Sequence, residues 1–181
     1  IPPFILRDCR SVLAKPLCYV YNISLETAIF PDWWKLTRVV PVPKGSDGTK
    51  VSNYRPIAVL SAPAKVFESA IQRSLQAQVS SILSDAQYGF RSGRSTTGNL
   101  QHLMAQVIPA VDAGNQVDVT YFDIKKAFDV VDKDILLRKL ADTGCTPHTL
   151  AFFASYMRDR RQYVDYAGYS SDCTIRGLAS H

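Results

Sequence analysis

The sequence predicts an α+β fold, because the spacing of its apolar residues changes along the chain. Residues 62–79 and 96–111 have helical spacing, with apolar side chains that recur every three or four positions. Residues 38–42 and 53–59 are instead extended by composition and lie on the two sides of a turn. A third extended stretch, residues 117–123, ends in an aspartate. With 181 residues, of which 46% are hydrophobic, the chain is large enough for one domain with its own core.

Charge and cysteine content narrow the classes of function. A formal charge of +5 favours an anionic partner such as nucleic acid, although many proteins of this size reach it. The four cysteines show no CxxC or Cys/His spacing, which favours buried thiols over zinc ligands or disulfides. No run approaches about 18 apolar residues, so we expect no membrane span and an intracellular protein of the cytoplasm or nucleus. The chain begins at Ile1 without Met or a signal peptide, which predicts a piece of a longer protein.

Two helices are expected at the N-terminus. Apolar residues have helical spacing over residues 4–14, and the pair Lys15 and Pro16 interrupts them. Pro16 suits the first turn of a second helix that ends near Pro31. The sequence therefore predicts a helical hairpin with a structural role.

A β-hairpin with a flexible tip is predicted over residues 38–59. Gly45 and Gly48 mark the turn. Two prolines at 41 and 43 force an edge position or break the strand, because proline cannot donate to a ladder. Between Lys35 and Arg55 there are five basic residues and a single acid, Asp47; the basic residues are Lys35, Arg38, Lys44, Lys50 and Arg55. Two interpretations stay open, a solvated hairpin with scattered charge and a flap that presents cations to phosphate oxygens.

The loop at residues 87–96 (QYGFRSGRST) combines two glycines, two arginines and three hydroxyl side chains. Its glycines are one residue too close for a P-loop, and Arg94 stands where that motif has lysine, so a P-loop is excluded. The composition still suits contacts with the backbone of a phosphodiester chain. Ser95 or Thr96 is expected to cap the helix that follows.

The strand predicted at residues 117–123 organises the second half of the chain. It delivers the carboxylate of Asp123 at its C-terminal end, where sheet-based enzymes often hold a metal or a phosphate. Helices are predicted at residues 133–141, with Asp132 near the N-cap, and at residues 147–157. Two short strands are then predicted to pair with each other, at residues 162–166 and 173–176.

Five of these passages together resemble the reverse transcriptase domain of non-LTR (LINE-type) retrotransposons, most like the insect jockey-type elements. The passages are residues 30–35 (FPDWWK), 40–44 (VPVPK), 53–57 (NYRPI), 87–96 (QYGFRSGRST) and 122–129 (FDIKKAFD). They occur in the family's order across nearly all of the chain. The resemblance implies the α+β fold of a right-hand polymerase, with an N-terminal helical extension at residues 1–29, fingers at 30–115 and a partial palm at 116–181.

The resemblance also implies a metal site. Asp123 is similar to the family's first metal-binding aspartate and is implied to be catalytic, and the carbonyl oxygen of Ile124 would help to hold the second of two Mg²⁺ ions. Mg²⁺ prefers hard oxygen ligands, which suits an aspartate. The competing interpretation of Asp123 is an aspartate that caps a turn at the end of a strand.

Nucleotide contacts are implied at four positions. Ala127 and Phe128 resemble the family's nucleotide-binding residues, and Phe128 would lie under the incoming sugar and disfavour a ribose 2′ hydroxyl. Lys44 and Arg55 resemble the cations of the fingers that contact the triphosphate. The alternatives are a core phenylalanine, a solvated lysine and a structural arginine. Asp129 also matches the motif, but it is assigned a local hydrogen-bonding role and no metal.

Template contacts are implied for Arg91 and Arg94, with a structural role as the alternative. The implied partners are an RNA template, a DNA primer and a dNTP. The chain departs from the family after Gly177, where Ala179 and Ser180 replace the Pro and Gln of a Gly-x-Pro-Gln-Gly-Ser loop. The strand hairpin that carries the family's second pair of aspartates is not in the sequence, so the chain is expected to be truncated before that motif.

The sequence therefore predicts a fragment of an RNA-directed DNA polymerase, which performs two-Mg²⁺ nucleotidyl transfer in the complete protein. One aspartate cannot hold two Mg²⁺ ions, so the fragment by itself is expected to be inactive. A second hypothesis is a catalytically inactive, element-derived module that binds nucleic acid. A third is an α/β domain with a structural or interaction role.

Overall fold

A computed structural model describes residues 1–45, 48–80, 82–124, 127 and 130–175. The helices are α1 (Pro3–Asp8), α2 (Arg10–Glu26), α3 (Ala62–Val79), α4 (Thr96–Asp112), α5 (Lys133–Asp142) and α6 (Pro147–Met157). The strands are β1 (Leu36–Pro43), β2 (Tyr54–Val59), β3 (Arg161–Tyr166), β4 (Tyr169–Ser170) and β5 (Thr174–Ile175), with short 3-10 helices η1 (Asp32–Trp34) and η2 (Val51–Asn53). This mixture confirms the predicted α+β class.

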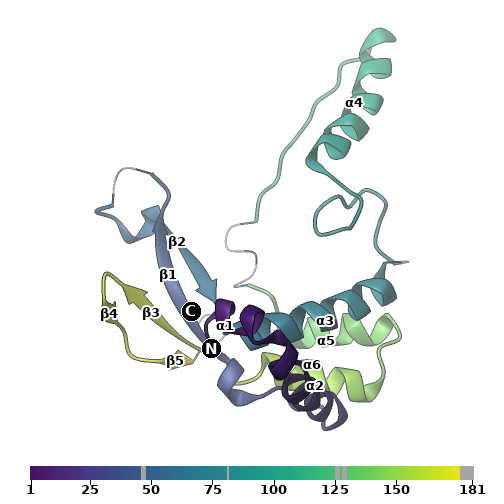
Figure 1. Ribbon diagram of the computed structural model, residues 1–181. Helices are drawn as coiled ribbons and strands as arrows, with labels where there is room; N and C mark the ends of the chain where they lie inside the picture. Colours follow the sequence, from purple (N-terminus) through teal and green to yellow (C-terminus); the bar gives the residue numbers. More distant parts are fainter. Residues whose placement is uncertain (46–47, 81, 125–126, 128–129, 176–181) are drawn as a thin grey trace.

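The elements gather in two groups, with one helix apart (Figure 1). Figure 1 shows the strands on one side of the molecule and helices α2, α3, α5 and α6 together beside them. Helix α4 stands away from both groups, at the end of long connecting segments. No helix of the described residues is long and apolar enough to cross a membrane.

The N-terminal helices differ from the predicted hairpin. The break falls at Cys9, and α2 runs through Pro16 without interruption. The predicted start of a second helix at Pro16 is therefore wrong. Proline inside a helix removes one hydrogen bond and costs about 3 kcal/mol. The helix continues because its later turns are held in place: Tyr21 donates its hydroxyl to the Pro63 carbonyl at 2.9 Å, and Ser24 is buried.

The other helices confirm the sequence predictions and show the expected caps. α3 spans the predicted residues, and α4 begins after Ser95, whose hydroxyl accepts from the Gly98 N–H at 3.0 Å. Asp132 caps α5 by accepting two backbone N–H groups. Side-chain oxygens that satisfy the first N–H groups of a helix fix where it starts.

The five strands form one sheet with the order β2-β1-β3-β4, and β5 also pairs with β3. β1 and β2 are antiparallel, which confirms the predicted hairpin. β3 pairs with β5 as expected, and it also pairs with β1 in parallel, from Leu36 opposite Arg161 to Val39 opposite Val164. The sheet therefore joins residues that lie more than a hundred positions apart.

The prolines of β1 mark where its parallel ladder ends. The predicted edge position is wrong for the strand as a whole, because β2 and β3 pair with it on opposite sides. Successive residues of a strand direct their N–H groups to opposite sides. The N–H of Lys44 points to β2, since it donates to the Asn53 carbonyl at 2.7 Å, so the missing donors of Pro41 and Pro43 face the β3 side. The pairing with β3 stops at Val39, before the first proline.

An aromatic core joins both ends of the chain. Its centre is formed by Phe30, Phe67 and Phe152, which are 0%, 1% and 3% exposed. Tyr21 of α2 stacks on Phe67 with ring centroids 4.6 Å apart, and Tyr156 of α6 meets Phe30 edge to face at 4.9 Å. Stacked and edge-to-face aromatic pairs stabilise a fold beyond the burial of their area. This core ties α2, α3 and α6 to the start of the sheet.

The strand predicted at residues 117–123 is not formed. Residues 115–124 have no regular secondary structure, and Tyr121 and Phe122 are 83% and 91% exposed. A β-strand needs a neighbour to accept and donate its backbone hydrogen bonds. Figure 1 shows this segment running between α4 and the lower helices, apart from the sheet. The composition of this segment favours a strand, but a strand does not form without a partner.

The cysteine prediction holds for one residue. Cys145 is buried, whereas Cys9, Cys18 and Cys173 are exposed, and all four are free thiols. The spacing of the cysteines did not predict that three of the four thiols are exposed.

Candidate functional site

Lys44 and Arg55 lie on the two arms of the β1–β2 hairpin, toward its tip. Arg55 pairs with Val42 across the ladder, so these two side chains point to the same face of the sheet. Lys44 follows the last residue of β1, and its Nζ donates to the Ser52 carbonyl at 2.9 Å. Both cationic side chains are exposed. The hairpin therefore presents two positive charges to solvent.

Arg91 and Arg94 hold together the loop that contains them. Arg91 donates from Nη1 to the Ser84 carbonyl at 2.7 Å, and Nη2 of Arg94 lies 2.9 Å from Oδ1 of Asp85. The Arg94 guanidinium also lies 5.0 Å from the centre of the Tyr88 ring, a cation–π distance. The two arginine side chains are 17% and 29% exposed, so each keeps an edge in solvent. Both arginines thus have a structural role in the loop, whatever else they bind.

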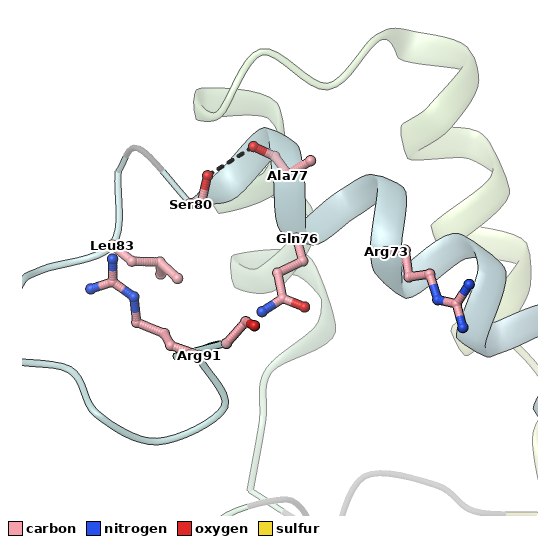
Figure 2. A pocket seen from close by; sticks show the side chains of 7 residues that line it. Arg73, Gln76, Ala77, Ser80, Leu83 and Arg91 are labelled. Atoms are coloured by element: carbon pink, nitrogen blue, oxygen red, sulfur yellow. Dashed lines mark hydrogen bonds between the residues drawn. The ribbon is translucent and has the colours of Figure 1, made fainter. Parts of the chain in front are cut away.

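Two open hollows border these arginines. The first, of about 300 Å³, lies between the loop and the C-terminal half of α3 (Figure 2). Figure 2 shows Gln76 extending from α3 toward Arg91, whose guanidinium turns back to Leu83, while Ser80 bonds to Ala77 of its own helix. The second, of about 540 Å³, is lined by Tyr88, Gly89, Arg94, Ser95, Thr96 and Asn99. An anion in either hollow would meet an arginine.

Asp123 and Ile124 are the last two of residues 115–124, which have no regular secondary structure. Both are exposed, Ile124 by 69%. Among the residues that the structure describes, no three His, Cys, Asp or Glu side chains lie together as a metal site would require. Ala127 is exposed, whereas Phe128 and Asp129 fall outside the described residues. The predicted site residues thus occur on three separate elements: the hairpin, the arginine loop and this segment.

Two ion pairs in and just before the hairpin were not predicted from the sequence. Arg38 of β1 lies 3.2 Å from Asp165 of β3 and links the two strands side chain to side chain. Lys35 has a side chain that is only 7% exposed, and its Nζ lies 2.9 Å from the Asp32 carboxylate. Its hydrogen bond and positive charge lower the pKa of Asp32. The spacing of three residues between Asp32 and Lys35 could have predicted their ion pair. The ion pair of Arg38 could not be predicted, because its partner Asp165 lies 127 residues away in the sequence.

The described residues therefore form an α+β domain with exposed cations on a hairpin and two arginines in a loop. A comparison with protein families makes the class specific. The family model described as "Reverse transcriptase (RNA-dependent DNA polymerase)" matches residues 42–175, which is well over half of the chain. The chain belongs to this reverse transcriptase family, and the resemblance drawn from its motifs is confirmed.

Two relatives of the chain are described as probable RNA-directed DNA polymerases of transposons. It is 32% identical over 151 residues to the probable RNA-directed DNA polymerase from transposon BS of Drosophila melanogaster, which covers 82% of the chain and 17% of that protein. It is 30% identical over 150 residues to the probable RNA-directed DNA polymerase from transposon X-element of the same fly, covering 81% and 16%. The chain therefore spans about a sixth of the length of these curated relatives.

Proposed function

We propose that the chain is part of an RNA-directed DNA polymerase that copies the RNA of a retrotransposon into DNA. The order of the five matching motifs and the family match over residues 42–175 carry this proposal. In it, residues 30–115 supply the fingers and residues 116–181 part of the palm, after a helical extension at residues 1–29. The sheet brings β3 of the second part against the hairpin of the first, so the two parts would act as one surface.

The hairpin cations would bind the triphosphate of an incoming dNTP. Lys44 and Arg55 are exposed and lie near one end of the same hairpin, which supports a shared ligand with several negative charges. Arginine holds phosphate oxygens with a planar set of N–H donors, and lysine adds a compact positive charge. A free triphosphate would replace the carbonyl of Ser52 as the acceptor for the Lys44 ammonium.

The arginine loop would contact the template strand. A guanidinium carries five N–H donors, so the bond from Arg91 to Ser84 and the ion pair of Arg94 with Asp85 still leave donors for phosphate oxygens. Two guanidinium groups face one carboxylate, which leaves a positive surplus in the loop. A surplus of this kind attracts a nucleic-acid backbone without reading its sequence.

The metal ligands would come from Asp123 and the carbonyl of Ile124. A carboxylate and a carbonyl oxygen are ligand types that Mg²⁺ accepts, so the donor chemistry fits. When bound, two Mg²⁺ ions stabilise the charge on the attacking and leaving oxygens. The carboxylate of Asp123 is exposed and would meet solvent or substrate directly, and Ala127 with Phe128 would line the sugar of the nucleotide. Two such ligands are too few for two ions. We therefore expect this chain to be inactive unless further carboxylates contribute to the metal site.

The binding part of this proposal is tested by the salt dependence of affinity. The chain should bind an RNA–DNA primer–template duplex, and the logarithm of the affinity should fall linearly with the logarithm of salt concentration. Substituting Lys44, Arg55, Arg91 or Arg94 by Gln should each reduce the slope by about 1. Lys15→Gln, an exposed lysine of α2, is the matched control and should leave the slope unchanged. Equal slopes for all five variants would contradict the phosphate contacts.

A second candidate function is a catalytically inactive module that binds nucleic acid. It is favoured by one observation: Arg55 lies on a paired strand and Arg91 and Arg94 bond to Ser84 and Asp85, whereas Asp123 lies on a segment without regular secondary structure. The two functions differ in primer extension by a longer polypeptide that includes this chain. Binding with no extension under any metal condition would favour the inactive module.

A further inference from the structure

Two tyrosines connect the hairpins beyond the point where their backbone pairing ends. The parallel ladder between β1 and β3 stops at Val39, because Pro41 and Pro43 have no N–H to offer on that side. Past this point Oη of Tyr54 and Oη of Tyr166 lie 3.2 Å apart. Their rings meet edge to face, with centroids 5.8 Å apart and planes at 87°. This side-chain contact thus links β2 to β3, which lie on opposite sides of β1, past the end of the ladder between β1 and β3.

The register places both tyrosines on one face of the sheet. Tyr54 pairs with Pro43, so their side chains share a face. Tyr166 comes two residues after Val164, the partner of Val39, and side chains two residues apart on a strand also share a face. Both phenols therefore stand on the face that carries the prolines of β1. They meet across the central strand from its two sides.

We propose that Tyr166 is a positioning residue that acts through Tyr54 to fix the tip of the β1–β2 hairpin, and with it the cations Lys44 and Arg55. This inference rests on the proposed function only where it assigns those cations to a triphosphate. The mechanical link itself follows from the contacts. It assigns a role to a tyrosine near the end of the described chain, far in sequence from the hairpin that it holds.

The hydrogen bonds form a chain with a fixed direction. Tyr54 donates its hydroxyl proton to the Gly48 carbonyl at 3.0 Å. A phenol has one proton to donate, so the proton between the two tyrosines comes from Tyr166, which donates to the Tyr54 oxygen. A Cβ at Gly48 would lie 2.9 Å from the Tyr54 oxygen, so a side chain at this position would have to displace the end of the Tyr54 side chain. Two hydrogen bonds, from Tyr54 to Gly48 and between the two tyrosines, thereby link the tip to β3.

The two cations, Lys44 and Arg55, lie next to the residues that form this link. Arg55 follows Tyr54 directly, and Lys44 bonds through Nζ to the carbonyl of Ser52 in η2. Residues 48–53 are therefore held at one end by the Tyr54 hydroxyl and at the other by Lys44. If the Tyr166 hydroxyl is removed, the hydrogen bond that links β3 to the Tyr54 hydroxyl is lost and the loop gains freedom. The separation between Lys44 and Arg55 then becomes less well defined.

Amide hydrogen exchange of the chain tests the link without any ligand. Tyr166→Phe keeps the ring and removes the hydroxyl, and it should speed exchange of residues 48–53 about fivefold, because one such hydrogen bond contributes on the order of 1 kcal/mol. Tyr169→Phe is the matched control, since that side chain is 82% exposed in the neighbouring strand β4. It should leave the same amides unchanged, and exchange in β1 at residues 36–39 should be unchanged in both variants. Equal tip exchange in Tyr166→Phe and wild type would overturn the link.

A double variant shows whether Tyr166 acts through Tyr54. Tyr54→Phe alone should speed tip exchange more than Tyr166→Phe, because it removes the bond to Gly48 as well as the bond between the phenols. Adding Tyr166→Phe to Tyr54→Phe should then change nothing further. Additive effects would show that Tyr166 does not act through Tyr54 and would overturn that step.

Affinity for inorganic tripolyphosphate tests the positioning of the cations. At a temperature where all variants are folded, Tyr166→Phe should raise the dissociation constant about twofold to fivefold, while Tyr169→Phe leaves it as in wild type. Lys44→Gln and Arg55→Gln test the proposed function separately, because both should weaken binding even if Tyr166 has no influence. If the two charge variants weaken binding and Tyr166→Phe does not, the positioning role is wrong. If neither charge variant has an effect, the triphosphate assignment fails and hydrogen exchange still decides the link.

Discussion

The aromatic body, which is the core around Phe30, Phe67 and Phe152 with the helices packed on it, differs from the outlying helix α4 in how much apolar surface it buries. Phe67 of α3 is 1% exposed and packs against rings from α2, η1 and α6. In α4, all of which is described, no residue is buried, and Leu100 and Ile108 are 57% and 53% exposed. Both helices are amphipathic by spacing. An apolar face therefore predicts a helix but not its burial, which depends on a packing partner.

The residues that form the core and the residues proposed to bind ligands differ in exposure in the same way. The rings of the body tie the sheet to the helices, whereas Lys44, Arg55 and Asp123 are all exposed. Ligand-contacting residues are often placed on mobile or exposed segments that a rigid scaffold supports. The body therefore fixes where the hairpin lies, and the exposed segments supply the groups that would meet substrate.

The largest effect should come from the centre of the body. Phe67→Ala should lower the free energy of unfolding by about 3–5 kcal/mol, because it removes a buried ring and leaves a cavity. Val66→Ala on the next position of α3, where the side chain is 51% exposed, should cost less than about 1 kcal/mol. Urea unfolding followed by tryptophan fluorescence measures both. Equal losses would show that the body is not organised around these rings.

A smaller, local effect is expected in the arginine loop. Asp85→Asn removes the partner of Arg94, an ion pair whose carboxylate is 94% exposed and which is worth about 1 kcal/mol or less. Trypsin should then cut after Arg91 and Arg94 a few times faster, while the time course of cleavage in the body is unchanged. Asp118→Asn, in the segment after α4, is the control. A loop cut at the wild-type rate would mean that Asp85 does not order it.

The pairing of Lys35 with Asp32 should appear as a pH effect. The hydrogen bond and charge of Lys35 lower the pKa of the folded Asp32 below its ordinary value of 3.8. A lowered pKa adds stability that is present above the ordinary value and is lost as pH falls through the folded one. Asp32→Asn should therefore flatten the fall in stability below about pH 4, measured by thermal unfolding across pH 2–6. Adding Lys35→Met should change this part of the curve no further, and a steeper curve would refute the pair.

The smallest effect is expected on the outlying helix. Leu100→Gln exchanges two residues of similar helix propensity at a position that is 57% exposed. The free energy of unfolding should stay within about 0.5 kcal/mol of the wild type. Helix content by circular dichroism should also stay the same. A loss of 2 kcal/mol or more would place this face of α4 in a packed interface and remove the contrast with the body.

Local signals predicted much of the fold, and non-local pairings set the limit. The bounds of α3 and the caps at Ser95 and Asp132 follow from spacing and side-chain chemistry within a few residues. The parallel pairing of β1 with β3 joins residues 125 positions apart, for which a single sequence holds no signal. The strand expected at residues 117–123 failed for the same reason, because strand formation depends on a partner rather than on composition.

The candidate site divides in the same way. Motif order predicted the family, and the hairpin that carries Lys44 and Arg55 followed from alternation and turn residues. The anchoring of Arg91 and Arg94 by Ser84 and Asp85 was not predicted, because loop contacts depend on the path of the backbone. The link between Tyr54 and Tyr166 was missed for a related reason: both are ordinary strand residues until the sheet sets them on one face.

Primer extension on an RNA template tests most directly whether this chain supplies the metal-binding aspartate of a polymerase. A longer polypeptide that contains the chain would be compared with its Asp123→Asn variant, and with Asp118→Asn as a control in the same segment. We predict that Asp123→Asn abolishes extension and keeps the affinity for primer–template, while Asp118→Asn extends as the wild type does. Extension retained by Asp123→Asn would contradict the metal-ligand role of Asp123 and the account built on it.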